Sequence, residues 1–250
     1  MAPRTPVVIG NWKMNGNREK VSELVTLLNT CKADRIDIIC APPSIYMLPV
    51  LSNVDERVQV ALQNCHSESY GAYTGELSPE MGEDVGCKWV ILGHCERRQK
   101  FGETDETIGR KIGHVMKNTN LNVIVCVGET LMERLTDQVM DVLNAQMQSI
   151  ARNVVDWSRV IIAYDAVWAT EVGIAPSPRQ LQQVCVGIRS FVSTVSGEDK
   201  GEALRIVYGG SVNANNCQEL KTEDLDGFLV GGAALKPDFL KIIACTEMQS

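Results

Sequence analysis

Eight short apolar segments rich in β-branched residues recur along the chain, separated by longer segments of mixed polarity. Each short segment is almost continuously apolar, which is typical of strands covered on both faces, as in parallel sheets. Several segments between them have apolar residues at helical spacing, for example Leu181, Val184, Ile188 and Val192. Alternating strands and helices predict a parallel sheet, and eight units predict closure into a (β/α)8 barrel. The expected strands are residues 7–11, 36–41, 58–64, 89–93, 122–127, 159–164, 204–208 and 227–230.

The length of 250 residues is that of one complete barrel of this kind, so we expect a single domain over residues 1–250. An open doubly wound sheet is the competing fold. It is disfavoured because no GxGxxG motif follows the first expected strand. Helical spacing predicts a helical segment from Leu131 to Ile150, and the segment from residue 166 to about Pro178 is expected to be a long loop.

Composition excludes several classes of function. The formal net charge is −7 without a basic cluster, so we expect neither nucleic acid nor a membrane surface as a partner. No apolar run is long enough for a membrane span or a signal peptide, which predicts a soluble, cytoplasmic protein. The nine cysteines include no CxxC pair, so their spacing predicts neither a metal site nor a redox motif.

Polar residues follow the expected strands where a (β/α)8 barrel places its active site, at the carboxyl ends. Each also has a structural explanation. A histidine at a strand end is more often a packed residue than a catalytic one, Lys13 could simply pair with Glu96, and Asp165 could cap a helix. The glycine pairs could be tight turns, or they could form the phosphate site typical of the last two strands. The residues concerned are Asn11, Lys13, His94, Glu96, Asp165, Gly209, Gly210, Ser211, Gly231 and Gly232.

Six segments make a more specific comparison possible. They are residues 10–15 (GNWKMN), 90–98 (VILGHCERR), 101–106 (FGETDE), 126–129 (CVGE), 208–213 (YGGSVN) and 227–237 (GFLVGGAALKP). In order and spacing, from about residue 5 to residue 245, they closely resemble the triosephosphate isomerase family. The resemblance implies interconversion of dihydroxyacetone phosphate and glyceraldehyde 3-phosphate by proton transfer through an enediolate, without metal or cofactor.

The resemblance also implies a role for each site residue. Lys13, placed by Asn11 and oriented by Glu96, would offset the charge of the substrate and the enediolate. A neutral His94 would polarise the carbonyl and move protons between the substrate oxygens, and Asp165 would be the base. The phosphate would be held by Ser211, by the backbone of Gly231 and Gly232, and by the lid through Glu171.

The chain departs from the family pattern around the base and the lid. Asp165 stands where the family has glutamate, which withdraws the carboxylate by about 1.5 Å, one C–C bond. Cys95 stands where the family has serine. In the lid, residues 166–176, Ala166 replaces proline, Glu171 replaces a glycine that donates its N–H to the phosphate, and Ile174 replaces lysine.

The segment 65–79 resembles the loop through which the family forms homodimers. By this resemblance, Thr74 of one subunit would approach Asn11 and Lys13 of the other, and we expect a homodimer. Three functions remain open: an active triosephosphate isomerase with a modified base and lid, a non-catalytic phosphosugar-binding paralogue of the same fold, or an isomerase for another substrate, such as an unphosphorylated one. Glu171 motivates the last, whereas the intact glycine pairs argue against it.

Overall fold

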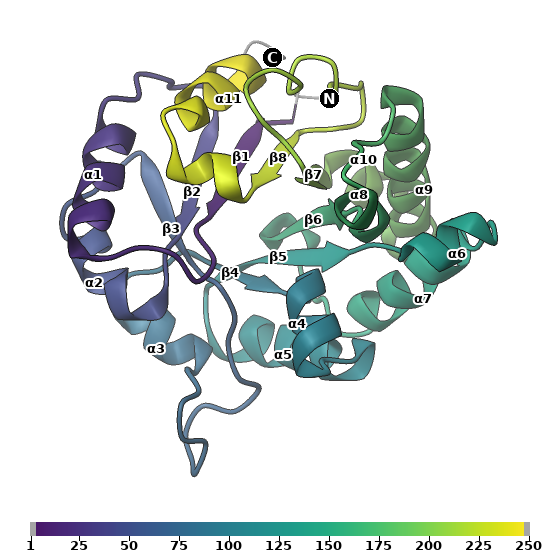
Figure 1. Ribbon diagram of the computed structural model, residues 1–250. Helices are drawn as coiled ribbons and strands as arrows, with labels where there is room; N and C mark the ends of the chain where they lie inside the picture. Colours follow the sequence, from purple (N-terminus) through teal and green to yellow (C-terminus); the bar gives the residue numbers. More distant parts are fainter. Residues whose placement is uncertain (1–3, 248–250) are drawn as a thin grey trace.

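Eight parallel strands pair in sequence order, and the last pairs with the first, which closes the sheet into a barrel (Figure 1). The computed structural model describes residues 4–247, except for the side chains of Thr170 and Glu171. The predicted (β/α)8 barrel is therefore confirmed, and all eight expected strands are present within two residues of their expected ends. They are β1 (Val7–Asn11), β2 (Asp37–Ala41), β3 (Val58–Leu62), β4 (Trp89–Leu92), β5 (Asn122–Val127), β6 (Val160–Asp165), β7 (Arg205–Gly210) and β8 (Gly227–Val230).

Helices surround the barrel and connect the successive strands from β1 to β7, whereas a segment without a helix joins β7 to β8 (Figure 1). No helix in the described part of the chain is long and apolar enough to span a membrane. The α-helices are α1 (Arg18–Asn29), α2 (Met47–Leu51), α3 (Pro79–Asp84), α4 (Cys95–Phe101), α5 (Asp105–Asn118), α6 (Leu131–Leu135), α7 (Val139–Ala151), α8 (Val167–Val172), α9 (Pro178–Ser196), α10 (Glu198–Ala203) and α11 (Asp238–Glu247), and short 3-10 helices are η1 (Ser44–Tyr46), η2 (Trp157–Arg159) and η3 (Gly232–Leu235).

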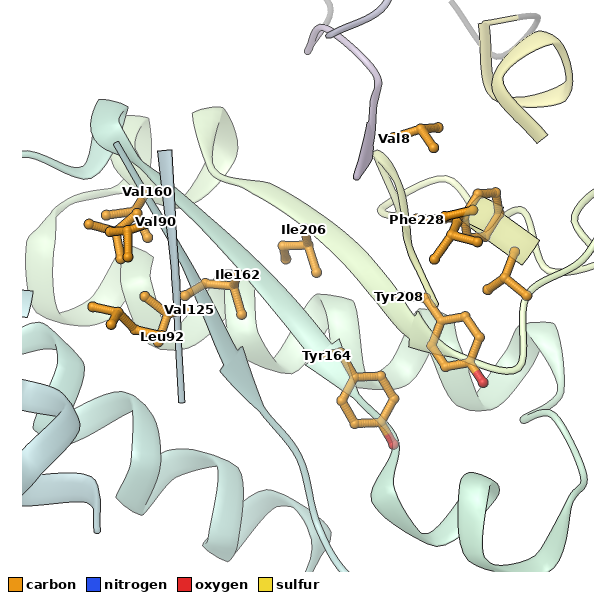
Figure 2. Packing of buried hydrophobic residues seen from close by; sticks show 14 of the residues in the cluster. Val8, Val90, Leu92, Val125, Val160, Ile162, Tyr164, Ile206, Tyr208 and Phe228 are labelled. Carbon is orange, nitrogen blue, oxygen red and sulfur yellow. The ribbon is translucent and has the colours of Figure 1, made fainter. Parts of the chain in front are cut away.

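The barrel has two apolar layers because neighbouring residues of a strand point to opposite faces. Val90 and Leu92 belong to a large cluster that also contains helix residues, so they face outward, and Figure 2 shows them beside Val125. Trp89 and Ile91 belong to a second cluster made of strand residues alone, which fills the barrel interior. Burial of both faces explains why the strand segments are almost continuously apolar.

Two connections differ from expectation. The helical segment predicted from Leu131 to Ile150 is two helices, α6 and α7, separated by Asp137, which has a φ of 59°. A left-handed backbone cannot continue a right-handed helix, and aspartate tolerates this conformation better than most residues. The segment after β6, expected as a loop, contains the short helix α8, which ends at Gly173 with a φ of 72°.

Candidate active site

The end of β1 fixes Lys13 in an uncommon backbone conformation. Lys13 has a φ of 52°, in the left-handed region that non-glycine residues rarely occupy. The side chain of Asn11 accepts a hydrogen bond from the Lys13 N–H (2.9 Å), and Gln63 donates to the Lys13 carbonyl (2.9 Å). These bonds stabilise a conformation that would otherwise cost about 1–3 kcal/mol, which is common at functional sites. Gln63, at the end of β3, is a positioning residue that the sequence analysis missed.

The end of β4 brings His94 and Glu96 to the same place. His94 caps the N-terminus of α4, and its Nδ1 accepts a hydrogen bond from the Glu96 N–H (3.2 Å). Since a backbone N–H can only donate, Nδ1 carries no proton, and Nε2 is the donor nitrogen of the ring. The Glu96 carboxylate accepts a hydrogen bond from the Lys13 ammonium at 2.9 Å, so the two charged groups are paired.

The end of β6 supplies Asp165, which is only 6% exposed. Its Oδ2 accepts a hydrogen bond from the backbone N–H of Cys95 (3.1 Å), the first residue of α4. Gly128, at the end of β5, lets this arrangement form, because a Cβ at that position would overlap the carbonyl oxygen of Asp165. Gly128 lies in the CVGE segment, but the sequence pattern did not indicate this close approach.

Burial and the charges of the site shift the pKa values of Glu96 and Cys95 in opposite directions. Burial alone would raise the pKa of Glu96, but the hydrogen bond and charge of Lys13 outweigh it and hold this pKa below its usual value. Burial, and then the charge of Asp165, raise the pKa of the Cys95 thiol well above its usual range. At neutral pH, Glu96 is therefore ionised and the Cys95 thiol is protonated.

These strand ends line one cavity of about 570 Å³. The ends of β7 and β8 complete it with polar and glycine residues, and a Cβ added at Gly232 would meet no atom within 4 Å, so the backbone there is open. Such an exposed backbone allows N–H groups to approach an anion. The predicted site residues in the cavity wall are Asn11, Lys13, His94, Glu96, Asp165, Ser211, Gly231 and Gly232.

The other two predicted residues stand differently: Thr74 is not among the described residues that line this cavity, and the structure does not describe the side chain of Glu171. Thr74 is exposed on the segment between β3 and α3, which projects away from the barrel in Figure 1. Glu171 lies in α8, but its side chain is outside the described residues, so its prediction as a phosphate-binding residue rests on the sequence.

The first residues of the lid pack near a buried carboxylate, Glu129, which was not among the predicted site residues. Glu129 is fully buried, and its Oε1 accepts hydrogen bonds from Arg134 (2.7 Å) and from the Tyr164 hydroxyl (2.8 Å). Trp168 of α8 donates to the same hydroxyl (3.4 Å) and stacks under the Arg134 guanidinium. Burial raises the pKa of Glu129 despite these partners. The start of the lid is thus attached to the loop after β5.

Comparisons with known proteins agree with this geometry. A sequence model of the triosephosphate isomerase family matches residues 6–246. The chain is 48% identical to the chloroplastic triosephosphate isomerase of Secale cereale, over 96% of this chain and 81% of that protein. A match of this length, together with the closed barrel and the cavity at its carboxyl end, establishes the relationship: the chain belongs to the triosephosphate isomerase family of intramolecular isomerases.

Proposed function

We propose that the chain interconverts dihydroxyacetone phosphate and glyceraldehyde 3-phosphate with Asp165 as the base, at a rate limited by the short reach of this side chain. The observation that carries the proposal is the single cavity in which Asp165, His94 and Lys13 meet from three different strands. A carboxylate, a neutral imidazole and an ammonium are the groups that proton transfer next to a carbonyl requires.

The proposed steps use these groups in turn. The Asp165 carboxylate removes a proton from the carbon beside the carbonyl. Negative charge then develops on the carbonyl oxygen, to which the Nε2–H of His94 donates a hydrogen bond, because Nδ1 is already bound to the Glu96 N–H. Lys13 offsets the charge of the enediolate. His94 gives its Nε2 proton to this oxygen and takes the hydroxyl proton from the oxygen of the deprotonated carbon. Asp165 then returns its proton to the former carbonyl carbon, and the new carbonyl forms at the carbon that lost its proton.

The phosphate would bind at the part of the cavity wall formed by the ends of β7 and β8. Ser211 is exposed there, and Gly231 and Gly232 have no side chains to cover their backbone. Anions bind readily where backbone N–H groups are accessible and a hydroxyl can donate.

The reduced rate follows from geometry. Aspartate ends about 1.5 Å short of where a glutamate carboxylate would be. A misplacement of ~1 Å can lower a rate by about 10²-fold. The departures in the lid, residues 166–176, would add to this effect if they slow closure, since a closed lid excludes water and completes the site.

A homodimer formed through the segment 65–79 is part of this proposal. Tyr70 on this segment is 80% exposed, and Met14, which directly follows Lys13, is 96% exposed. A partner that covers these two side chains would remove apolar surface from water, which favours association. Sedimentation of the protein as a monomer at micromolar concentration would contradict the dimer.

The function is tested by an assay that couples formation of glyceraldehyde 3-phosphate from dihydroxyacetone phosphate to its oxidation. We expect turnover above a heat-killed control, and loss of it in Asp165→Asn, which keeps the shape but cannot accept the proton. Binding of phosphoglycolate without any turnover, including in Asp165→Glu, would instead identify a phosphosugar-binding paralogue.

A further inference from the structure

Three side chains with different metal-ligating groups meet at the mouth of the barrel. The imidazole of His94, the thiol of Cys95 and the carboxylate of Asp165 each offer a ligand atom, and these atoms all lie within 4.8 Å of one another. His94 and Asp165 are 8% and 6% exposed, and Cys95 is half-buried. The cluster joins the start of α4 to the end of β6, so it does not appear as a motif in the sequence.

The spacing suits a small tetrahedral ion. The Cys95 Sγ lies 3.7 Å from the His94 Nδ1. With Zn–S near 2.3 Å and Zn–N near 2.0 Å, a tetrahedral site places these two ligands about 3.5 Å apart. Asp165 has two carboxylate oxygens, so that one can ligate a metal while Oδ2 keeps its hydrogen bond from the Cys95 N–H.

The chemistry of the ligand set selects the metal. A thiolate and an imidazole favour Zn²⁺ or Cd²⁺ over Mg²⁺ and Ca²⁺, which prefer oxygen ligands. Three protein ligands with a fourth position open to the cavity are also typical of zinc sites that bind water or a small molecule.

We propose that His94, Cys95 and Asp165 bind one Zn²⁺ ion, and that this ion excludes the triose phosphate. On binding, the ion replaces the Glu96 N–H at the lone pair of His94 Nδ1, the Sγ–H proton of Cys95 is released to solvent, and a Zn–S bond forms. The thiolate and the Asp165 carboxylate together neutralise the ion. The nearby ammonium of Lys13 is already paired with Glu96 at 2.9 Å, which reduces its repulsion of the ion.

The ion would occupy the space between the proposed base and the proposed proton donor. Zinc and substrate would therefore compete. This competition rests on the proposed function, whereas binding of the metal does not, so the two can fail separately.

The test uses the purified chain, freed of metal with a chelator. Equilibrium dialysis should show one Zn²⁺ per chain, and Co²⁺ substituted for it should give tetrahedral d–d bands with a thiolate-to-cobalt charge-transfer band. Removing a residue that is only hydrogen-bonded to a metal ligand lowers metal affinity by about 10–100-fold. Cys95→Ser removes a ligand itself, so it should weaken zinc binding by at least about 100-fold. The matched control Cys31→Ser, at a half-buried cysteine outside the cavity, should bind as the unaltered protein does.

Circular dichroism is the control for folding of Cys95→Ser. We expect this variant to fold, because serine and cysteine have nearly the same shape. Phosphoglycolate should raise the apparent Kd for Zn²⁺ in proportion to its concentration. Absence of a one-to-one complex, or equal zinc affinity of Cys95→Ser and Cys31→Ser, overturns the proposal. Zinc binding without any isomerase turnover would leave the metal site standing and remove the proposed function.

Discussion

The carboxylate of Asp165 accepts a hydrogen bond from the backbone N–H of Cys95, with 3.1 Å between Oδ2 and N. This bond ties the end of β6 to the first turn of α4, directly beside His94. The proposed base is therefore held near the N-terminal end of a helix, where a negative charge is favoured.

A longer side chain at this position should act faster. In Asp165→Glu, the added methylene extends the carboxylate by about 1.5 Å, and the cavity of about 570 Å³ has room for it. We expect kcat to rise by about 10–100-fold, because a misplacement of ~1 Å can cost about 10² in rate. Steady-state kinetics with both triose phosphates provide the measurement. Equal or lower kcat in this variant would mean that the aspartate is already at the correct distance.

The first residue of the lid should tolerate proline. Ala166 has a φ of −68°, which proline adopts, and the preceding Asp165 is in a strand. Proline would remove the hydrogen bond from the Ala166 N–H to the Gly209 carbonyl (3.2 Å), at a cost of about 1 kcal/mol. Restriction of the unfolded chain offsets about 0.4–1 kcal/mol of this cost. Ala166→Pro should therefore change the free energy of unfolding, measured by urea denaturation, by less than about 1 kcal/mol.

The control for this prediction lies one turn further on. Ala169 donates its N–H to the Ala166 carbonyl (3.0 Å), and it is fully buried in α8. Ala169→Pro should lower the free energy of unfolding by about 3 kcal/mol. If the two variants are equally destabilised, the backbone conformation assigned to Ala166 is wrong.

The barrel could be predicted from the sequence because both faces of each strand are buried, which leaves a clear local pattern. The break between α6 and α7 at Asp137 could not be predicted, because the apolar residues on both sides keep helical spacing and nothing in the sequence marks the left-handed backbone of Asp137. The site residues at the ends of β1 and β4 could be named from their positions. The contacts between site residues could not be predicted. The approach of Asp165 to Cys95 depends on how β4, β5 and β6 pack side by side, and no local sequence pattern indicates this packing.

Gly128 illustrates this limit and gives a further prediction. A Cβ there would overlap the backbone carbonyl of Asp165, so Gly128→Ala must move the end of β6. Overpacking of this kind typically costs about 1–3 kcal/mol, and we expect kcat to fall together with the free energy of unfolding. Gly209→Ala is the matched control for stability, because its Cβ would meet Leu229 at 3.5 Å, an ordinary contact. Equal stability of Gly128→Ala and the unaltered chain would contradict the close approach.

A buried ion pair between Glu103, which follows α4, and Lys111 of α5 predicts how stability depends on pH. Glu103 accepts hydrogen bonds from Lys111 (2.7 Å) and Arg97 (2.8 Å), and Lys111 is only 5% exposed. Burial alone would raise the pKa of Glu103, but the hydrogen bonds and charges of Lys111 and Arg97 hold this pKa below its usual value. A carboxyl whose pKa is lowered by folding stabilises the protein above its unfolded pKa of about 4.3, and this contribution disappears as the pH falls through the folded pKa.

Glu103→Gln should therefore have its largest effect at neutral pH. Removing the negative charge leaves the buried Lys111 ammonium with Asn64 but without an opposite charge, which costs about 3–5 kcal/mol. Urea unfolding between about pH 7 and pH 3 should show the variant and the unaltered chain converging as the pH falls, since protonation removes the same charge from Glu103. Asp199→Asn, at an exposed ion pair with Lys200, should show little difference from the unaltered chain over this range. A constant difference between Glu103→Gln and the unaltered chain at every pH would show that the carboxyl acts through its shape rather than through its charge.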